Sequence, residues 1–440
     1  MIRFDADELI SMLRANGVDR LYHVTDASNW DTIQKSGIFS SKLIETKKVP
    51  GVTYGSDRIS QIISRNKGLD QYVHLSFSST PSSLPRSFEK GYMENLITLE
   101  ISLEVFNQED TVVSSYDPLD ERAHRLSSAS EIAEVDFEAA KAGAAFTSDT
   151  PADKAKAGAT VLVHGAIPRS YILNADEIEA EMKRKSSAGE RRKAIVFLVD
   201  LTSAMDGSVS LRGQFHATYG DAAKALTNSA VTQIMKSAIT RSTVRDDVDV
   251  FLFEYSDSVG SLWRFPGKDS DRKTCPELYR EMIIRLEREG ARTVWTKDVM
   301  PHGRCNPADA IRMVSQIVER WGFEHRGCMN PLVIHITNGR NATSNLMSIT
   351  KEFSLIRQNS SFLWNYLIHE DMTISFPATS YGEQTGLGNE GEIVYGISDR
   401  CRGPLAKAYC DLTGTELTED RRTMMVNSDL SLLVSAFLGL

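Results

Sequence analysis

Cysteine is scarce in this 440-residue chain, which contains five. All of them lie in the C-terminal half, their number is odd, and no pair has CxxC spacing: Cys275, Cys305, Cys328, Cys401 and Cys410. A disulfide or zinc framework needs cysteines paired at short, regular spacings. We therefore expect reduced thiols.

Long hydrophobic runs are also absent. The longest, such as AIVFLVD at residues 194 to 200, are far shorter than the ~20 residues that cross a bilayer. The start, MIRFDADELI, lacks the basic-then-apolar layout of a signal peptide. These features predict a cytoplasmic protein without membrane contact. Hydrophobic residues at 41% and charged residues at 25% are typical of a globular chain.

An excess of positive charge is missing as well. The net charge is −9, with 24 Lys and Arg against 29 Asp and Glu up to Lys193, and 26 against 30 after it. Proteins that gain affinity for nucleic acid by releasing counterions usually carry a basic surface. Net charge therefore does not support a nucleic-acid substrate, although a local positive groove remains compatible with the sequence.

What the chain does contain is a marked change of composition. The segment ADEIEAEMKRKSSAGERRK, residues 175 to 193, carries charges of both signs and almost no apolar residues after Met182. Such a segment is typical of a helical tail that continues into a linker. We therefore expect a first domain at 1–174, a charged linker at 175–193 and a second domain at 194–440.

The first domain mixes helical and strand patterns. Apolar residues at helical spacing end in Asn-Gly within 5–17, and Ser28 is expected to cap a second helix that Gly37 ends. Strict alternation over 97–105 predicts a half-buried strand. Three more strands and a helix are expected at 21–25, 72–77, 160–167 and within 127–143. This mixture predicts an α+β fold.

The second domain alternates regularly between apolar strands and amphipathic helices. Strands are expected at 193–200, 248–256, 331–337 and 361–369, and helices at 219–241, 275–290, 306–321 and 344–357, before two closing helices. Continuous apolar strands between amphipathic helices are typical of a parallel sheet covered on both faces. We expect a doubly wound α/β domain.

The turn after the first strand of this domain, DLTSAM at residues 200 to 205, resembles the metal-ion-dependent adhesion site of von Willebrand factor A domains. GRCNPADAI at 303–311 and VIHITNG at 333–339 resemble two further blocks of that family, and its modules from bacterial conflict systems look most similar. The resemblance covers about 194 to 440 and implies a Rossmann-like domain that binds a protein partner.

Magnesium prefers about six oxygen ligands, and the five positions that the resemblance assigns supply few of them. Asp200 and Thr202 could each contribute one oxygen, and Asn338 stands where the family has aspartate. Ala204 has no oxygen, and Cys305 is a soft donor. Two alternatives remain: a degenerate, empty site in a protein-interaction module, which we favour, and a site that still binds metal.

A second motif is GLGNEG at residues 386 to 391, which matches GxGxxG. The dinucleotide fingerprint requires a strand directly before it and a long helix after it. Neither pattern is evident, so we interpret this segment as a loop.

The stretch YHVTDASNW at 22–30, followed by IQKSGIFSS, resembles the start of DarT-type ADP-ribosyltransferases. These are toxins that transfer ADP-ribose from NAD to thymine in single-stranded DNA. The resemblance continues at DQYVHLSFSSTPSSL, residues 70 to 84, and at residues 135–172. It spans about 20 to 175 and implies the ADP-ribosyltransferase fold with NAD as the cofactor.

The resemblance also implies which residues form the site. His23 and Thr25 end a strand at the floor of the cleft, where they would bind NAD together with nearby Asn29 and with Tyr72 on the next matching block. An arginine after the first helices would contact the cofactor, and Arg58 is the first choice, with Arg65 as the second. The alternative role for His23 is a hydrogen-bonded histidine at the end of a strand.

The catalytic residue is where the chain departs from the family. The family has a glutamate on a late strand, whereas the matching block GATVLV at 158–163 places Thr160 there. A hydroxyl cannot carry the negative charge that stabilises a sugar cation, and losing one such group commonly costs about 10² to 10³ in kcat. Three acidic residues of the preceding helical segment could replace it only with suitable geometry: Glu131, Glu134 and Glu138.

Two functional hypotheses follow. The first is an ADP-ribosyltransferase that modifies nucleic acid or protein in antiphage defence or as a toxin. The second is a catalytically inactive scaffold or sensor with a degenerate transferase site and a degenerate metal site. In both, the second domain would raise the local concentration of the first near a partner, and deleting 194–440 is expected to weaken the biological effect.

Overall fold

The computed structural model describes residues 5–93, 95–148, 150–187, 192–266, 271–289, 293–340, 362–370, 386–414, 416, 418 and 421–440. The chain divides into two units. The first comprises Met1–Arg184 together with Ile239–Val244 and Leu278–Thr293, and the second comprises Lys185–Ala238, Arg245–Glu277 and Val294–Leu440. Among the described residues, no helix combines the length and the hydropathy needed to cross a membrane.

The main sheet of the first unit is antiparallel and has the strand order β4-β1-β3-β7-β5-β6. Its strands are β1 (Leu21–Asp26), β3 (Tyr72–Ser76), β4 (Leu96–Ile101), β5 (Val112–Ser114), β6 (Arg125–Leu126) and β7 (Thr160–His164). The strands β2 (Ile38–Phe39) and β8 (Ala166–Ile167) form a separate pair. Tyr22 faces Ser76, and Ser76 faces Thr160, so the register aligns the ends of three strands.

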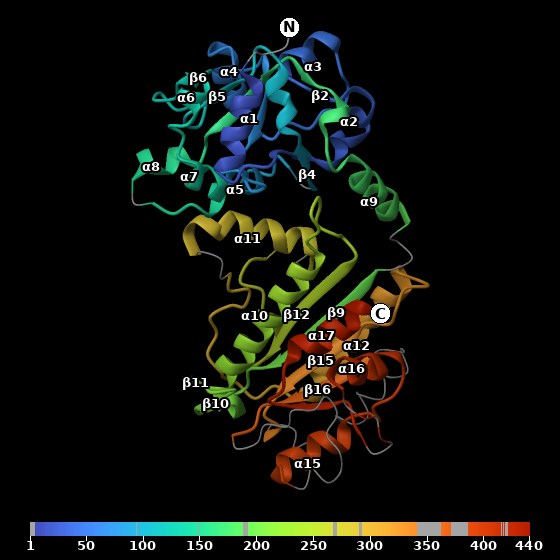
Figure 1. Ribbon diagram of the computed structural model, residues 1–440. Helices are drawn as coiled ribbons and strands as arrows, with labels where there is room; N and C mark the ends of the chain where they lie inside the picture. Colours follow the sequence, from blue (N-terminus) through green and yellow to red (C-terminus); the bar gives the residue numbers. More distant parts are fainter. Residues whose placement is uncertain are drawn as a thin grey trace. The chain divides into compact units, whose positions relative to one another are not determined.

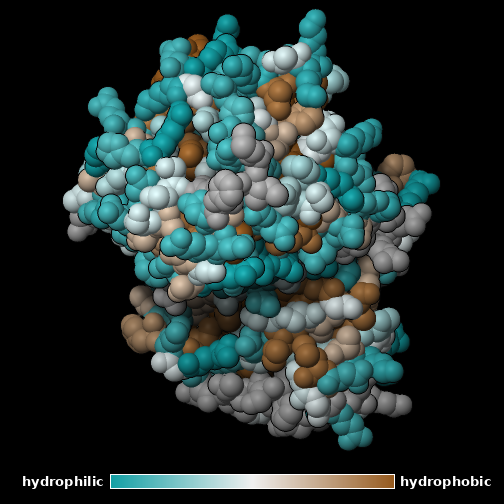
Figure 2. Space-filling view, turned by 45° about the horizontal axis from the view of Figure 1, so that its top comes forward, coloured by the Kyte–Doolittle hydropathy of each residue, from teal (hydrophilic) through white to brown (hydrophobic). Residues whose placement is uncertain are grey.

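Short helices surround this sheet and complete the α+β fold. They are α1 (Ala6–Ala15), α2 (Trp30–Ser36), α3 (Ser41–Lys47), α4 (Arg58–Asn66), α5 (Leu84–Glu89), α6 (Ala129–Ile132), α7 (Phe137–Ala142), α8 (Pro151–Lys156) and α9 (Ala175–Ser187). A continuous apolar core joins α1, α2 and the strands, with Leu9, Trp30 and Leu99 among its members. In Figure 2 the face turned to the viewer is mostly hydrophilic, with hydrophobic residues in small groups.

Two local predictions for the first unit are wrong. The strand expected at 97–105 ends at Ile101 and is buried along its whole length. The segment 239–244 pairs with it: the Thr98 N–H donates to the Ser242 oxygen at 2.8 Å, and both Arg20 and Arg241 donate to Glu100. A 3-10 helix follows the strand, with Ser102 accepting from the Glu104 N–H. Ser28 does not cap α2, since its hydroxyl contacts the Thr53 hydroxyl at 2.9 Å.

The second unit is an α/β domain with a mixed sheet of order β13-β12-β9-β15-β16-β17, to which β14 adds beside β12. Its strands are β9 (Lys193–Asp200), β12 (Val248–Tyr255), β13 (Val259–Ser261), β14 (Arg272–Thr274), β15 (Leu332–Thr337), β16 (Phe362–Leu367) and β17 (Met424–Val426), with a separate hairpin of β10 (Val209–Leu211) and β11 (Gln214–His216). The pairs among the four predicted strands, β12, β9, β15 and β16, are parallel, as predicted. The strand β17, which was not predicted, also pairs parallel with β16, whereas β13 and β14 run antiparallel to β12.

Helices pack on this parallel core because β9 is buried from Ala194 to Asp200. Alternate residues of β9 pack against α12 in one apolar core, and α10 also contacts β9. Figure 1 shows α10 and α17 side by side. The helices are α10 (Tyr219–Ala238), α12 (Pro307–Glu324), α15 (Gly388–Ile397), α16 (Pro404–Thr413) and α17 (Leu430–Gly439); α11 (Cys275–Glu289) belongs to the first unit from Leu278 on.

Two predictions for this half need comment. The segment 386–391 is not a loop, because α15 begins at Gly388 and continues for ten residues. The helix expected at 344–357 lies outside the described residues.

Candidate active site

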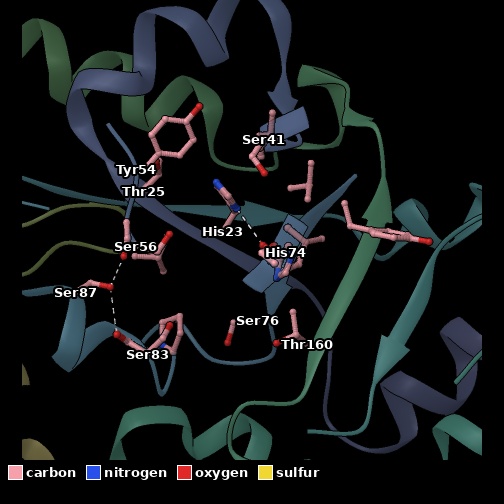
Figure 3. Close-up of a pocket in the computed structure, with 18 of the residues that line it drawn as sticks. His23, Thr25, Ser41, Tyr54, Ser56, His74, Ser76, Ser83, Ser87 and Thr160 are labelled. Atoms are coloured by element: carbon pink, nitrogen blue, oxygen red, sulfur yellow. Dashed lines mark hydrogen bonds between the residues drawn. The ribbon is translucent and has the colours of Figure 1, made fainter. Parts of the chain in front are cut away.

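A pocket of about 420 Å³ lies in the first unit, along β1 and β3 and at the start of β7. Loops around residues 52–56, 81–83 and 117–119 complete its walls. Its lining is rich in hydroxyl groups, from Ser41, Ser56, Ser60, Ser64, Ser76, Ser82, Ser83 and Ser87 as well as Thr25, Thr32, Thr53 and Thr160. Figure 3 shows Ser83 and Ser87 along one side and Ser76 beside Thr160. No lysine or arginine occurs among the described residues that line it.

His23 projects from β1 into this pocket (Figure 3). Its Nδ1 lies 3.1 Å from the backbone oxygen of His74. A carbonyl oxygen can only accept, so Nδ1 carries the proton, and Nε2 of the neutral ring is left as an acceptor. Burial lowers the pKa of His23 below its ordinary value, which favours this neutral form. His23, which was predicted to bind NAD, thus presents Nε2 to the pocket as a hydrogen-bond acceptor.

Thr25 and Asn29 are both buried and lie together at the same end of β1. Asn29 Nδ2 donates to Thr25 Oγ1 and to the Thr53 oxygen, each at 2.8 Å, and Asn29 Oδ1 accepts from the Thr53 N–H at 2.8 Å. All three hydrogen-bonding groups of this amide are therefore used within the protein. Asn29 fixes the loop that carries Thr53 and Tyr54 against the pocket.

Tyr72 and Thr160 line the pocket from β3 and β7. The Tyr72 ring packs edge to face on His164, with ring centres 5.4 Å apart, and the Arg125 guanidinium lies 5.2 Å from its centre. Thr160 Oγ1 donates to the Gly158 oxygen at 2.7 Å. The residue at the expected glutamate position is therefore in the pocket, but its hydroxyl proton is held by the backbone.

The two arginine candidates lie elsewhere. Arg58 begins α4 and is exposed, whereas the pocket-lining residues of that helix are Ser60, Gln61 and Ser64. Arg65 pairs with Glu45 on the surface. Neither arginine lines the pocket as it stands, so a cofactor contact by Arg58 or Arg65 stays a prediction.

The acidic residues considered for the missing glutamate do not line the pocket either. Glu131 caps α6, where its side chain accepts from the Ser127 and Ser128 N–H groups. Glu134 and Glu138 are exposed.

Sequence reasoning missed Asp117, which supplies the one carboxylate among the described lining residues, and it missed His74 and Tyr54. Asp117 and Tyr54 lie in loops that follow no periodic pattern, so spacing gave no signal for them.

In the second unit, Asp200 is fully buried and its oxygens are used internally. Oδ1 accepts from the Thr202 N–H at 3.0 Å and the Thr202 hydroxyl at 2.7 Å, and Oδ2 accepts from the Thr337 hydroxyl at 2.9 Å. Burial raises the pKa of Asp200, which opposes the ionised form that a cation needs.

Asn338 is committed in the same way. Its Nδ2 donates to the Ala204 oxygen at 2.6 Å, and its Oδ1 accepts from the Arg340 N–H at 3.1 Å. Across the part of the chain that the structure describes, no three His, Cys, Asp or Glu side chains gather as a metal site. Asp200, Thr202 and Asn338 therefore hydrogen-bond within the protein, and the empty magnesium site stays a prediction.

Residues 22–189 match the family model described as "ssDNA thymidine ADP-ribosyltransferase, DarT". The first unit carries a DarT-like domain. The match includes the pocket residues from His23 to Thr160 and confirms the resemblance found in the N-terminal sequence. The comparison with curated proteins gives no match.

Three solved structures show distant likeness. The DarT of Thermus sp. 2.9 in complex with ADP-ribosylated ssDNA is 18% identical over 38% of this chain and 89% of that chain, with a TM-score of 0.31. Thermosipho africanus DarTG in complex with ADP-ribose is 12% identical over 79% of this chain and 95% of that chain, with a TM-score of 0.32. Manganese-loaded Plasmodium vivax TRAP protein is 13% identical over 40% of this chain and 57% of that chain, with a TM-score of 0.27. These TM-scores are too low to establish a shared fold.

Proposed function

We propose that the DarT-like domain is an ADP-ribosyltransferase that uses NAD and modifies thymidine in single-stranded DNA. The observation that carries this proposal is the coincidence of the family match over 22–189 with a pocket along β1 and β3 and at the start of β7. The family description names the reaction and the acceptor. Net charge does not argue for a nucleic-acid substrate, so the acceptor must be tested rather than assumed.

The pocket has the volume of a small-molecule site and a chemistry suited to parts of a dinucleotide. Its volume of about 420 Å³ lies within the ~300–1,000 Å³ range of small-molecule sites. The hydroxyl-rich wall offers donors and acceptors for ribose and phosphate oxygens, with His23 and Thr25 on β1 and Tyr72 at the start of β3. When bound, NAD supplies an ADP-ribosyl group that carries nicotinamide as its leaving group. The protein would hold the ribose beside the neutral His23 ring.

The test is incubation of the full chain with labelled NAD and single-stranded DNA, with RNA and a protein lysate as alternative acceptors. His23→Ala removes the acceptor nitrogen at the pocket and is expected to abolish transfer. His124→Ala is the matched control, because His124 is exposed and does not line the pocket. Absence of both label transfer and NAD binding in the wild-type chain would refute the proposal.

A second candidate function is a sensor or scaffold that binds NAD without transferring ADP-ribose. It is favoured by Thr160, whose hydroxyl is bonded to the Gly158 oxygen, and by the exposed position of Arg58. Calorimetry distinguishes the two functions. NAD binding that depends on His23, with no label on any acceptor, would select the sensor.

For the second unit we propose a von Willebrand A-type interaction domain that binds a protein partner without metal, in a cytoplasmic toxin or defence system. The internal bonds at Asp200 and Asn338 support the metal-free form. Calorimetric titration with Mg²⁺ is expected to give no heat of binding, and partner capture should persist in a chelator. Micromolar affinity for Mg²⁺ would contradict this proposal.

A further inference from the structure

Asp117 is brought to the pocket by the pairing of β5 with β7. Ser114, near the end of β5, faces Thr160 at the start of β7. Because these strands are antiparallel, the chain that leaves β5 passes back over the residues that precede Thr160. Asp117 lies in this loop and lines the pocket. The carboxylate is 43 residues from Thr160 in sequence, yet it belongs to the same end of the sheet.

Gly158 allows this close approach. A Cβ atom built on Gly158 would lie 2.7 Å from Asp117 Cβ and 3.0 Å from Asp117 Cα, which is closer than side-chain carbons pack. Any larger residue at 158 would push the loop away. Because residue 158 has no side chain, Asp117 lies against the backbone two positions before Thr160. Thr160 is the position at which the family has its glutamate.

Hydrogen bonds hold Asp117 and its loop in place before any ligand binds. Its N–H donates to the Ala155 oxygen at 3.1 Å, and its Oδ1 accepts from the Leu119 N–H at 2.9 Å. Lys67 Nζ donates to the Leu119 oxygen at 2.8 Å and so ties the loop to the end of α4. A charge that is already held in place stabilises a developing opposite charge without reorganisation.

The charge of Asp117 also acts on the pocket wall. It raises the pKa of His74, against the larger lowering effect of burial. His74 lies on β3 between β1 and β7, and its backbone oxygen accepts from His23. The carboxylate of Asp117 therefore acts electrostatically on His74 of β3, the residue whose backbone oxygen is hydrogen-bonded to His23 of β1.

We propose that Asp117 is the catalytic carboxylate of this pocket and replaces the glutamate that Thr160 does not supply. This inference rests on the proposed transferase function. Transfer breaks the bond between the nicotinamide nitrogen and ribose C1′, and its electron pair leaves with nicotinamide. The acceptor atom forms a new bond to C1′ with its own electron pair. Asp117 stabilises the positive charge that develops on the ribose and takes the proton that the acceptor loses, which then passes to water.

The decisive variant is Asp117→Asn in the full chain, because it removes the charge at nearly constant shape. We expect kcat for ADP-ribose transfer to fall by about 10² to 10³, with little change in the KM for NAD, as for an interaction made only in the transition state. Glu121→Gln is the matched control, because Glu121 is an exposed carboxylate in the same loop. It should transfer at the wild-type rate.

Two further measurements do not depend on turnover. NAD binding by calorimetry should be retained in Asp117→Asn, and NMR titration should show a lower pKa of His74 than in the wild-type chain. If Asp117→Asn transfers ADP-ribose at the wild-type rate, this inference is wrong while the transferase function stands. If the wild-type chain neither binds NAD nor transfers ADP-ribose, both fail.

Discussion

At the scale of single residues, Asn29 shows how a predicted binding residue can act through the protein itself. Its amide makes three hydrogen bonds, to Thr25 and twice to Thr53, and is 7% exposed. A direct contact of Asn29 with NAD remains a prediction. The geometry shows that this side chain positions the loop that holds Tyr54 at the pocket.

Replacing Asn29 with alanine should leave the buried hydroxyl and the loop N–H without partners. Losing buried partners costs about 1–3 kcal/mol per group, so the free energy of unfolding should fall by at least that amount in chemical denaturation. NAD affinity should fall too, because the loop is released. Asn66→Ala is the control, since Asn66 ends α4 on the surface. Equal stability of both variants would contradict this role.

At the residue scale, His23, Thr25, Tyr72 and Thr160, which the motifs selected, line one pocket. Their roles in binding and catalysis stay predictions. Asp117 could not be found in this way, because its position depends on the pairing of β5 with β7 and on the small residue at 158. Strand pairing between distant segments leaves no spacing signal in a single sequence.

At the scale of elements, the turn before β7 and the loop after β5 are packed too closely to accept a side chain at 158. Gly158→Ala would place a methyl group 2.7 Å from Asp117 Cβ, and such overpacking costs about 1–3 kcal/mol. We expect lower thermal stability and a displaced Asp117, with kcat reduced although every charge is kept. Gly322→Ala offers a contrast for packing, because nothing lies within 4 Å of its built Cβ and Gly322 lies in α12, where its φ is not positive. A fully active Gly158→Ala enzyme would show that the position of Asp117 is unimportant.

The two pocket strands β1 and β3 each carry an imidazole whose pKa lies below the ordinary 6.5, chiefly because burial disfavours the charged form. In the unfolded chain both rings titrate near 6.5, so below that pH the unfolded state binds protons that the native state does not. The free energy of unfolding should therefore fall as the pH drops through 6.5, and be recovered above it. Each unit of pKa difference corresponds to about 1.36 kcal/mol.

Denaturant titrations at pH 7.5 and 5.5 measure this effect. The double variant His23→Asn with His74→Gln keeps polar groups near the two hydrogen bonds but cannot titrate. It should lose less stability than the wild-type chain between the two pH values. If the double variant and the wild-type chain lose the same free energy of unfolding between pH 7.5 and 5.5, other titratable groups cause the acid sensitivity.

Element types were predictable to the extent that hydrophobic pattern determines them. The helix at Ala6–Ala15 and the strand at Lys193–Asp200 lie where periodicity placed them. Alternation at 97–105 gave the wrong burial for β4, because the segment 239–244 pairs with its edge and Glu100 is neutralised by Arg20 and Arg241. It also gave the wrong end, because Ser102 starts a 3-10 helix. Tertiary partners of this kind cannot be seen in a local pattern.

At the scale of the whole molecule, the two units have separate cores, yet their sequence segments are interleaved. Residues 239–244 and 278–293 belong to the first unit although they follow the second unit's first strand and helix. Cutting the chain at 193 therefore removes part of the first unit. The simple division at 175–193 does not describe which segments pack together.

Deleting 194–440 should weaken the cellular effect, because the first unit loses the partner-binding domain that raises its local concentration. It should also lower the melting temperature of the first unit, through the loss of its two distal segments. Growth assays and thermal unfolding of the truncated chain measure the two effects separately. A truncated chain with full potency in cells would rule out the concentration argument.

The absence of lysine and arginine from the described lining of the pocket has a consequence for the forces that capture a dinucleotide. A pyrophosphate bound by hydroxyls and backbone groups gains little from long-range attraction between opposite charges. Dissolved salt screens that attraction and has little effect on short hydrogen bonds. The dissociation constant for NAD should therefore stay nearly flat between dilute buffer and concentrated salt. A steep rise of this dissociation constant with added sodium chloride would show that a cationic side chain moves to the pyrophosphate on binding. Exposed Arg58 is the first residue to test.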